Sequence, residues 1–136
     1  MSYLLDTNAV ILLMAGGPVG MRQRFREAIA RGAAVSVSTV VLFELWYGVA
    51  NSPRRQANAE RLRAFLSGAV HVAPFEQADA VVAGFIRAGL RQAGRPIGPY
   101  DTLIAAQALR TGATLVTANS TEFGRVPGLT LEDWTR

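Results

Sequence analysis

Three acidic residues stand out because apolar residues flank them closely. Only ten Asp and Glu residues occur in the 136-residue chain. Asp6 follows the segment YLL, Glu44 lies within VVLFELWYG, and Asp101 lies near the start of the apolar run in IGPYDTLIAAQAL. A buried carboxylate without a partner is strongly destabilising, so each must be paired, exposed or used chemically. One such acid alone could be a helix cap or the partner of an arginine, whereas three together favour a shared chemical role.

Carboxylates gathered without lysine or cysteine repel one another and need a cation. Mg²⁺ or Mn²⁺ is the natural ion, because hard cations prefer oxygen ligands. Such an ion could orient a water molecule, lower its pKa and offset charge on a phosphoryl group under in-line attack. These residue types therefore favour metal-dependent phosphodiester hydrolysis. Without metal, we expect repulsion among Asp6, Glu44 and Asp101 to raise their pKa values.

The composition narrows the possible chemistry. All fourteen basic residues are arginine, the net charge is +4, and there is no cysteine. The lack of lysine argues against P-loop phosphate binding, Schiff bases and lysine-assisted phosphoaspartate chemistry. The lack of cysteine suits a reducing cytosol, and the longest apolar run, residues 9–15, is too short for a membrane span or signal peptide. We therefore expect a cytoplasmic protein. The arginines suit a polyanionic partner, although a solvated arginine-biased surface explains them equally well.

The spacing of apolar residues predicts strands that alternate with helices in a single domain, residues 1–136. The predicted strands are 3–5, 33–37, 70–73 and 114–116, and the predicted helices are 7 to about 15, 19–30, 39–50, 53–68, 76–94 and 99–110, with a short element ending near residue 134. This alternation is typical of an α/β fold with a parallel sheet covered on both faces. Ligands of such sheets bind beyond the carboxyl ends of the strands. Asp6 follows the first strand and Asn119 lies just beyond the fourth, so we expect both at that edge.

Several motifs occur in a fixed order between residue 3 and about residue 134. They are LLDTN, FELWYG, GRPIGPYDTLIAAQAL, LVTANSTEF, VPGL and EDW. This ordered set resembles the PIN-domain ribonucleases, and most of all the VapC-type toxins of bacterial toxin–antitoxin pairs. The resemblance implies a three-layer α/β/α sandwich, Mg²⁺- or Mn²⁺-dependent endoribonuclease activity, a cognate VapB-type antitoxin and a homodimer.

By the same resemblance, Asp6, Glu44, Asp101 and Asn119 are the catalytic and metal-binding residues. Asn119 stands where some members carry aspartate, and its uncharged amide argues against a second tightly bound metal. Thr7 and Thr117 offer hydroxyl groups to a metal-bound water or the scissile phosphate, or serve only as caps. Glu122 is interpreted as a solvated turn acid rather than an additional charge at the site.

We expect most of the other charged residues to have structural or surface roles rather than catalytic ones. His71 is expected at an exposed strand position without a catalytic role. The remaining acids are interpreted as solvated surface or capping groups: Glu27, Glu60, Glu76, Asp79, Glu132 and Asp133. Arg87 and Arg91 are one helical turn apart with Arg95 just beyond, a spacing that could follow an RNA backbone, although a solvated face is favoured.

Two questions about function stay open. The apolar surface around Trp46 and Tyr47 would suit either core packing or the binding of an antitoxin helix. The alternative to the enzyme is a catalytically weak PIN-fold module that binds RNA or a protein through its acidic pocket, and the presence of all three acids favours the enzyme. A phosphohydrolase with Asp6 as nucleophile is disfavoured, because Asn8 replaces a second acid and lysine is missing.

Overall fold

The computed structural model describes all residues 1–136 and contains one five-stranded sheet in which every strand pair is parallel. The strands are β1 (Ser2–Leu5), β2 (Ala34–Ser38), β3 (His71–Ala73), β4 (Thr114–Val116) and β5 (Leu131–Glu132). The helices are α1 (Thr7–Met14), α2 (Val19–Ala30), α3 (Thr39–Ala50), α4 (Arg55–Leu66), α5 (Gln77–Gln92), α6 (Pro99–Thr111) and α7 (Ser120–Phe123). The strand order β3-β2-β1-β4-β5 places the first strand in the middle of the sheet.

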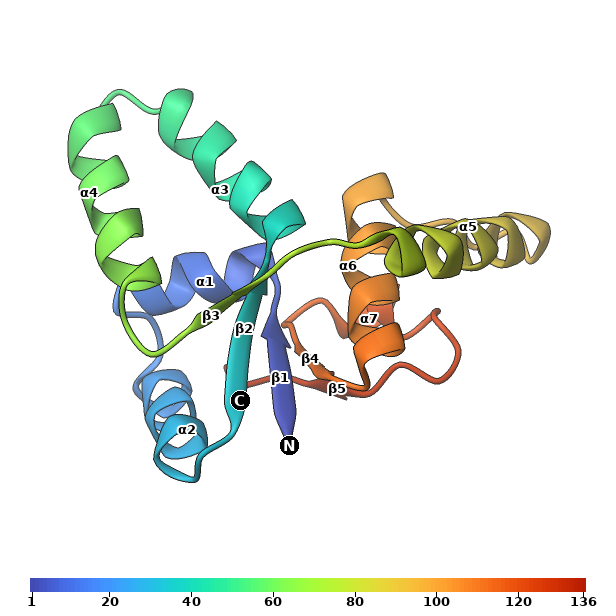
Figure 1. Cartoon of the computed structure of the whole chain (residues 1–136), viewed down its shortest axis with the longest axis horizontal. Helices are drawn as coiled ribbons and strands as arrows, with labels where there is room; N and C mark the ends of the chain where they lie inside the picture. Colours follow the sequence, from blue (N-terminus) through green and yellow to red (C-terminus); the bar gives the residue numbers. More distant parts are fainter.

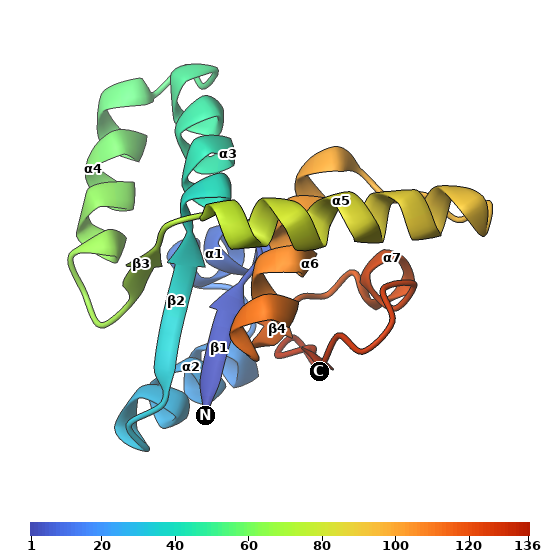
Figure 2. The ribbon, with the colours of Figure 1, turned by 45° about the vertical axis from the view of Figure 1, so that its right-hand side comes forward.

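Helices enclose the sheet on both sides, which confirms the predicted α/β/α sandwich. Helices α1 and α2 lie behind the sheet, whereas α6 lies in front of it with α5 packed across α6 (Figures 1 and 2). The α3–α4 pair extends beyond the carboxyl ends of the strands (Figure 1). No helix is both long and apolar enough to cross a lipid bilayer.

The central strands are apolar on both faces, as expected for a parallel sheet between two helix layers. Leu5 of β1 pairs with Val37 on one side and Val116 on the other, and all three side chains are buried. At the opposite end of β1, the Tyr3 ring meets Trp134 edge-on, with ring centroids 5.2 Å apart. The C-terminal segment is therefore packed against the start of the central strand.

The predicted long elements are present with small shifts of their ends, and two short elements were missed. The helix predicted from residue 53 begins at Arg55. Only a short element of unspecified type ending near residue 134 was expected in this region, whereas the structure has the four-residue helix α7 and the two-residue strand β5. Elements this short contain too few residues to show a periodic apolar pattern.

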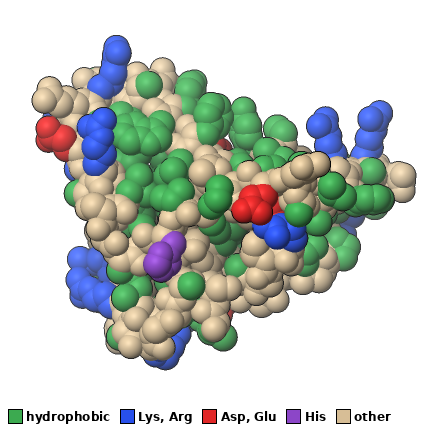
Figure 3. Space-filling view, viewed as in Figure 1, with side chains coloured by type: hydrophobic (Ala, Val, Ile, Leu, Met, Phe, Trp, Pro, Cys, Tyr) green, Lys and Arg blue, Asp and Glu red, His purple; other side chains and the backbone are tan.

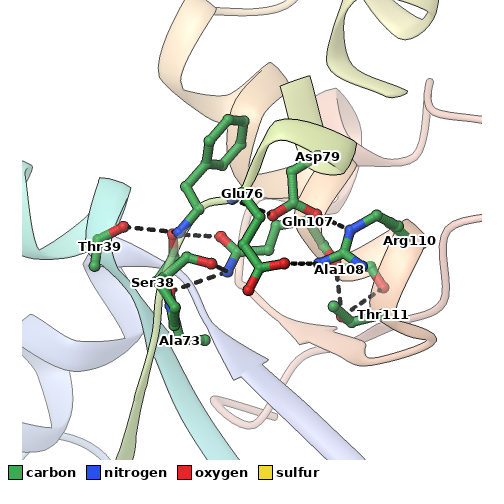
Figure 4. Close-up of polar contacts among 11 residues, drawn as sticks. Ser38, Thr39, Ala73, Glu76, Asp79, Gln107, Ala108, Arg110 and Thr111 are labelled. Atoms are coloured by element: carbon green, nitrogen blue, oxygen red, sulfur yellow. Dashed lines mark hydrogen bonds and ion pairs between the residues drawn. The ribbon is translucent and has the colours of Figure 1, made fainter. Parts of the chain in front are cut away.

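Buried Gln107 connects α6 to the junction of β2 with α3 and to the end of β3 (Figure 4). Its Oε1 accepts a hydrogen bond from the Ser38 hydroxyl at 2.5 Å, and its Nε2 donates to the carbonyl oxygens of Ala73 at 3.0 Å and Pro74 at 3.3 Å. The Ser38 oxygen also accepts from the Val40 N–H and so caps α3. Because carbonyls only accept hydrogen bonds, this pattern sets the orientation of the amide.

Asp79 forms a second connection, between α5 and α6, and its position corrects the sequence interpretation. It was interpreted as a solvated or capping group, but its side chain is completely buried. One oxygen accepts a hydrogen bond from Arg110 Nε of α6, and the other accepts from the Glu76 N–H at 2.8 Å. The capping role is therefore correct, and the solvated one is wrong because Arg110 compensates the buried charge (Figure 4).

Replacing Gln107 with Leu should destabilise the protein, because it leaves the buried Ser38 hydroxyl hydrogen and two carbonyl oxygens without this partner. We expect a loss of about 2–4 kcal/mol in the free energy of unfolding, measured by urea denaturation. Gln92 is an exposed glutamine on α5, so Gln92→Leu is the matched control and should change stability by less than about 0.5 kcal/mol. Equal stability of Gln107→Leu and the parent would show that the Gln107 hydrogen bonds contribute nothing.

Candidate active site at the carboxyl end of the sheet

Asp6 is fixed where β1 ends and α1 begins. Its side chain is buried, and its Oδ1 accepts a hydrogen bond from the Ala9 N–H at 2.8 Å, so Asp6 caps α1. Its own N–H donates to the Val116 carbonyl at 3.1 Å, which ties it to the end of β4. Strand order reverses between β1 and β4, the position at which α/β sheets bind ligands. The expected location of Asp6 is therefore confirmed.

Asp101 approaches this edge from the first turn of α6. Gly98 is the N-terminal cap without a side-chain hydrogen bond, and Pro99 is the first helical residue. Proline is common at this position because its fixed φ suits the helix and it has no N–H to leave unsatisfied. The following turns of α6 are buried in the core. Their packing fixes the position of the first turn, which carries the half-buried Asp101 side chain.

Glu44 lies in the second turn of α3 and is linked to the start of α1. Its Oε1 accepts a hydrogen bond from the Thr7 hydroxyl at 2.7 Å. Thr7 directly follows Asp6, so this bond draws Glu44 toward the end of β1. The Thr7 hydroxyl thus binds a candidate site residue, a role that the sequence analysis did not foresee.

Asn119 and Glu122 lie at the two ends of the first turn of α7. Asn119 Nδ2 donates to Glu122 Oε2 at 2.8 Å, and the Asn119 N–H donates to the Thr117 hydroxyl at 2.9 Å. Glu122 is half-buried, and its charge helps to raise the pKa of Asp101. The interpretation of Glu122 as a solvated turn acid is therefore wrong, because the Asn119 amide holds its carboxylate toward the acidic site.

Burial is the largest influence on the two aspartates. It raises the pKa of Asp6, against the lowering effects of the Thr117 hydroxyl and the Ala9 N–H. Burial likewise raises the pKa of Asp101, from 3.8 to about 6, with further contributions from the charges of Glu122, Glu44 and Asp6. The expected repulsion is thus real at both aspartates but smaller than desolvation. Asp101 therefore lies near enough to Glu122, Glu44 and Asp6 for their charges to act on it.

Asp133, which was assigned to the surface or a cap, also acts on this site. Its negative charge is one of the causes that raise the pKa of Asp6. Its own carboxylate accepts hydrogen bonds from the Thr135 hydroxyl and N–H, which lower its pKa. The sequence contained no signal for this proximity, because Asp133 reaches Asp6 only through the folding of the C-terminal segment beside β1.

The acidic site lacks a protein counter-ion. The three ion pairs of the chain involve Arg110 and Arg136, and none includes Asp6, Glu44, Asp101 or Glu122. No three Asp, Glu or His side chains are grouped closely enough to hold a metal ion by themselves. Mg²⁺ needs only one or two carboxylates, since it retains several waters. The oxygen donors and their uncompensated charge therefore fit a hydrated divalent cation.

Comparison with known proteins gives one consistent result. Residues 3–129 match the model of the PIN domain family. The chain is 37% identical over 134 residues to the tRNA(fMet)-specific endonuclease VapC of Shigella flexneri, covering 98% of both chains. It is similar to the structure of VapBC2 from Rickettsia felis bound to promoter DNA, with a TM-score of 0.92, 36% identity, and coverage of 98% of this chain and 99% of that one. It also resembles VapBC-1 from nontypeable Haemophilus influenzae, with a TM-score of 0.88, 29% identity and full coverage of both chains.

The raised pKa of Asp101 predicts how stability depends on pH without metal. A carboxyl group whose pKa is higher in the folded state stabilises the fold fully below its ordinary pKa of 3.8 and loses that effect as pH rises through about 6. In EDTA the parent should therefore melt at a lower temperature at pH 7.5 than at pH 5.

Asp101→Asn should reduce this pH effect, because the amide is nearly isosteric and uncharged. Since the carboxyl group is partly solvated, we expect a gain of about 1 kcal/mol at pH 7.5, or roughly 3 °C in melting temperature. Glu60→Gln, on the exposed face of α4, is the control and should not change the melting temperature. If Asp101→Asn melts well below the parent in EDTA, Asp101 has a structural rather than a cation-binding role.

Proposed function

The chain belongs to the PIN-domain family, and on that premise we propose that it is a VapC-type endoribonuclease toxin with an active site formed by Asp6, Glu44, Asp101 and Asn119. The observation that carries this proposal is that buried Asp6 and half-buried Glu44 and Asp101 lie without a counter-ion near the ends of β1 and β4. A partner-binding surface has no need for mutually repelling carboxylates at such a position. A nuclease needs them to attract a cation to the scissile phosphate.

The proposed activity is phosphodiester hydrolysis of RNA, dependent on Mg²⁺ or Mn²⁺. A bound divalent ion would lower the pKa of a water molecule and offset charge on the phosphoryl group. Asp6 and Asp101 are the proposed direct ligands, because both are fixed by backbone elements at the strand exit. Glu44, held by Thr7, and Asn119 are the residues that we propose would orient water molecules around the ion. The raised pKa of Asp101 makes ion binding compete with protonation.

Transfer RNA is the first substrate to test. The Shigella relative is named as specific for tRNA(fMet), and this chain matches it along its length. We therefore propose tRNA(fMet) as the substrate of this chain.

A cognate VapB-type antitoxin is the proposed regulator, and the structure offers a place for it. A cavity of about 300 Å³ lies between α1, α3 and α4. Apolar side chains line most of it, among them Ile11, Leu45 and Val49, and Glu44 also borders it. Such a groove fits the apolar face of a helix. An arginine from that helix could reach the uncompensated acids through the Glu44 side of the cavity.

Purified protein should cleave tRNA(fMet) in Mg²⁺ or Mn²⁺ and lose this activity in EDTA. Asp6→Ala and Asp101→Ala should each lower the single-turnover cleavage rate by about 100-fold or more, because each removes a proposed ion ligand. Glu60→Ala removes the same charge from an exposed position and should keep the parent rate. Cleavage that persists in EDTA, or in both aspartate variants, would contradict the assignment of the site.

Ile11→Arg should weaken antitoxin binding without abolishing RNA cleavage. Ile11 lines the cavity and is 46% exposed, so the arginine should block an apolar helix face without disturbing the core. We expect an increase of at least about tenfold in the Kd for the purified cognate antitoxin, measured by calorimetry. Val19→Arg lies outside the cavity and is the control. Equal affinities for both variants would place the antitoxin elsewhere.

A further inference from the structure

Two arginines on α5 border a cavity that the acidic site does not include. Arg87 and Arg91 are one helical turn apart, and both are exposed. A cavity of about 370 Å³ is lined by these two arginines, by Ile97 of the segment that leads into α6, and by Pro99 and Thr102 of the first turn of α6. A second hollow of about 530 Å³ adjoins the same two arginines on the surface of α5.

The charge of this surface is positive and unneutralised. No acidic residue lines either hollow, and the ion pairs of the chain involve only Arg110 and Arg136. Figure 3 shows basic side chains projecting from the end of the molecule formed by α5, with hydrophobic side chains between them and the α3–α4 pair. The guanidinium groups of Arg87 and Arg91 are therefore available to a ligand with negative charge.

The arginine cavity shares a structural wall with the acidic site. Pro99 and Thr102, which line the cavity, flank Asp101 in the first turn of α6. The loop before α6 is held by Arg125, whose Nη1 donates to the Pro96 carbonyl at 2.9 Å. Arg125 lies two residues after the end of α7, the helix that contains Glu122 and is capped by Asn119. A ligand that spans the first turn of α6 would therefore contact both places.

We propose that Arg87 and Arg91 form an RNA subsite that binds backbone phosphates next to the scissile one. This inference rests on the proposed ribonuclease function and extends it to how the substrate is held. The carboxylates of the acidic site repel phosphates. A single divalent ion there would offset only part of this repulsion for a polyanion such as RNA. Arginine binds phosphate oxygens through a planar pair of N–H donors, and two arginines on one helix face can hold a strand in a fixed direction.

The proposal also explains a feature of α6. The helix begins without a side-chain cap, and Pro99 removes one of its free N–H groups. The first turn of α6, with the positive end of the helix dipole, includes both Asp101 and the cavity-lining residues Pro99 and Thr102. A strand that crosses from the arginines to the acids thus meets favourable electrostatics at the start of α6 rather than a neutral gap.

The test measures RNA binding separately from cleavage. The Kd for a fluorescently labelled tRNA(fMet) transcript is determined by anisotropy in EDTA over a series of KCl concentrations. The Arg87→Ala/Arg91→Ala double variant should bind at least about tenfold more weakly at low salt. Its plot of log Kd against log salt should have a slope smaller by about 1.4, because each single-strand phosphate contact contributes about 0.7.

Two matched variants separate the arginine cavity from charge in general. Arg54→Ala/Arg55→Ala removes the same charge at the start of α4, which Figure 1 places far from the end of α5, and should keep the parent slope. Arg87→Lys/Arg91→Lys should also keep the slope, because its charges remain. Equal losses in both alanine double variants, a lysine variant that loses the slope, or unchanged binding by Arg87→Ala/Arg91→Ala would each overturn the proposal.

The outcomes also distinguish this inference from the proposed function. If the parent binds tRNA(fMet) through Arg87 and Arg91 but cleaves no RNA in Mg²⁺ or Mn²⁺, the ribonuclease assignment fails and the arginine subsite stands. If cleavage occurs and KM is unchanged in the Arg87→Ala/Arg91→Ala variant, the ribonuclease assignment stands and the subsite fails. A duplex DNA that binds as tightly as the RNA, with the same change in slope, would assign the cavity to DNA and overturn the RNA subsite.

Discussion

Negative charge held without a counter-ion at the end of the central strand is the constraint on which this structure depends. Asp6 cannot move away, because its N–H is bound to the end of β4 and its carboxylate to the first turn of α1. Asp6 lies where the strand order reverses between β1 and β4, the position at which ligands bind to open α/β sheets. Each element that carries another acid must bring that carboxylate close to Asp6, despite the electrostatic repulsion between them and the cost of removing both from water.

The supports that hold these acids together are neutral rather than ionic. Glu44 is bound by the Thr7 hydroxyl, and Glu122 by the Asn119 amide. Farther from the site, the Ser38–Gln107 hydrogen bond connects the cap of α3, which carries Glu44, to the interior of α6, which carries Asp101. An arginine at any of these places would have neutralised the acids. Neutral donors fix the geometry and leave the charge available to a cation.

The sequence was sufficient for strands β1 to β4, the long helices and the position of Asp6 at the end of β1, because each depends on local patterns. Asp6 was recognisable since it directly follows a buried strand, and Asp101 since it opens an apolar helix. Asp79 and Glu122 were misinterpreted for a different reason. The burial of Asp79 depends on Arg110, a partner on another helix, and the direction of Glu122 depends on the Asn119 amide. Apolar periodicity reports which face of a helix is buried and contains no information about such pairs.

Charge also links the two proposed ligands of the acidic site. A divalent ion and an antitoxin arginine would satisfy the same carboxylates, so binding of one lowers the affinity for the other. Thermodynamic linkage makes the effect reciprocal: the factor by which the ion weakens antitoxin binding equals the factor by which the antitoxin weakens ion binding. The proposed RNA substrate would meet the opposite situation, because the acids would repel its phosphates and the arginines would attract them. In this scheme an antitoxin arginine would do more than obstruct access to the site, because neutralising Asp6, Glu44 and Asp101 would remove the charge that attracts the ion.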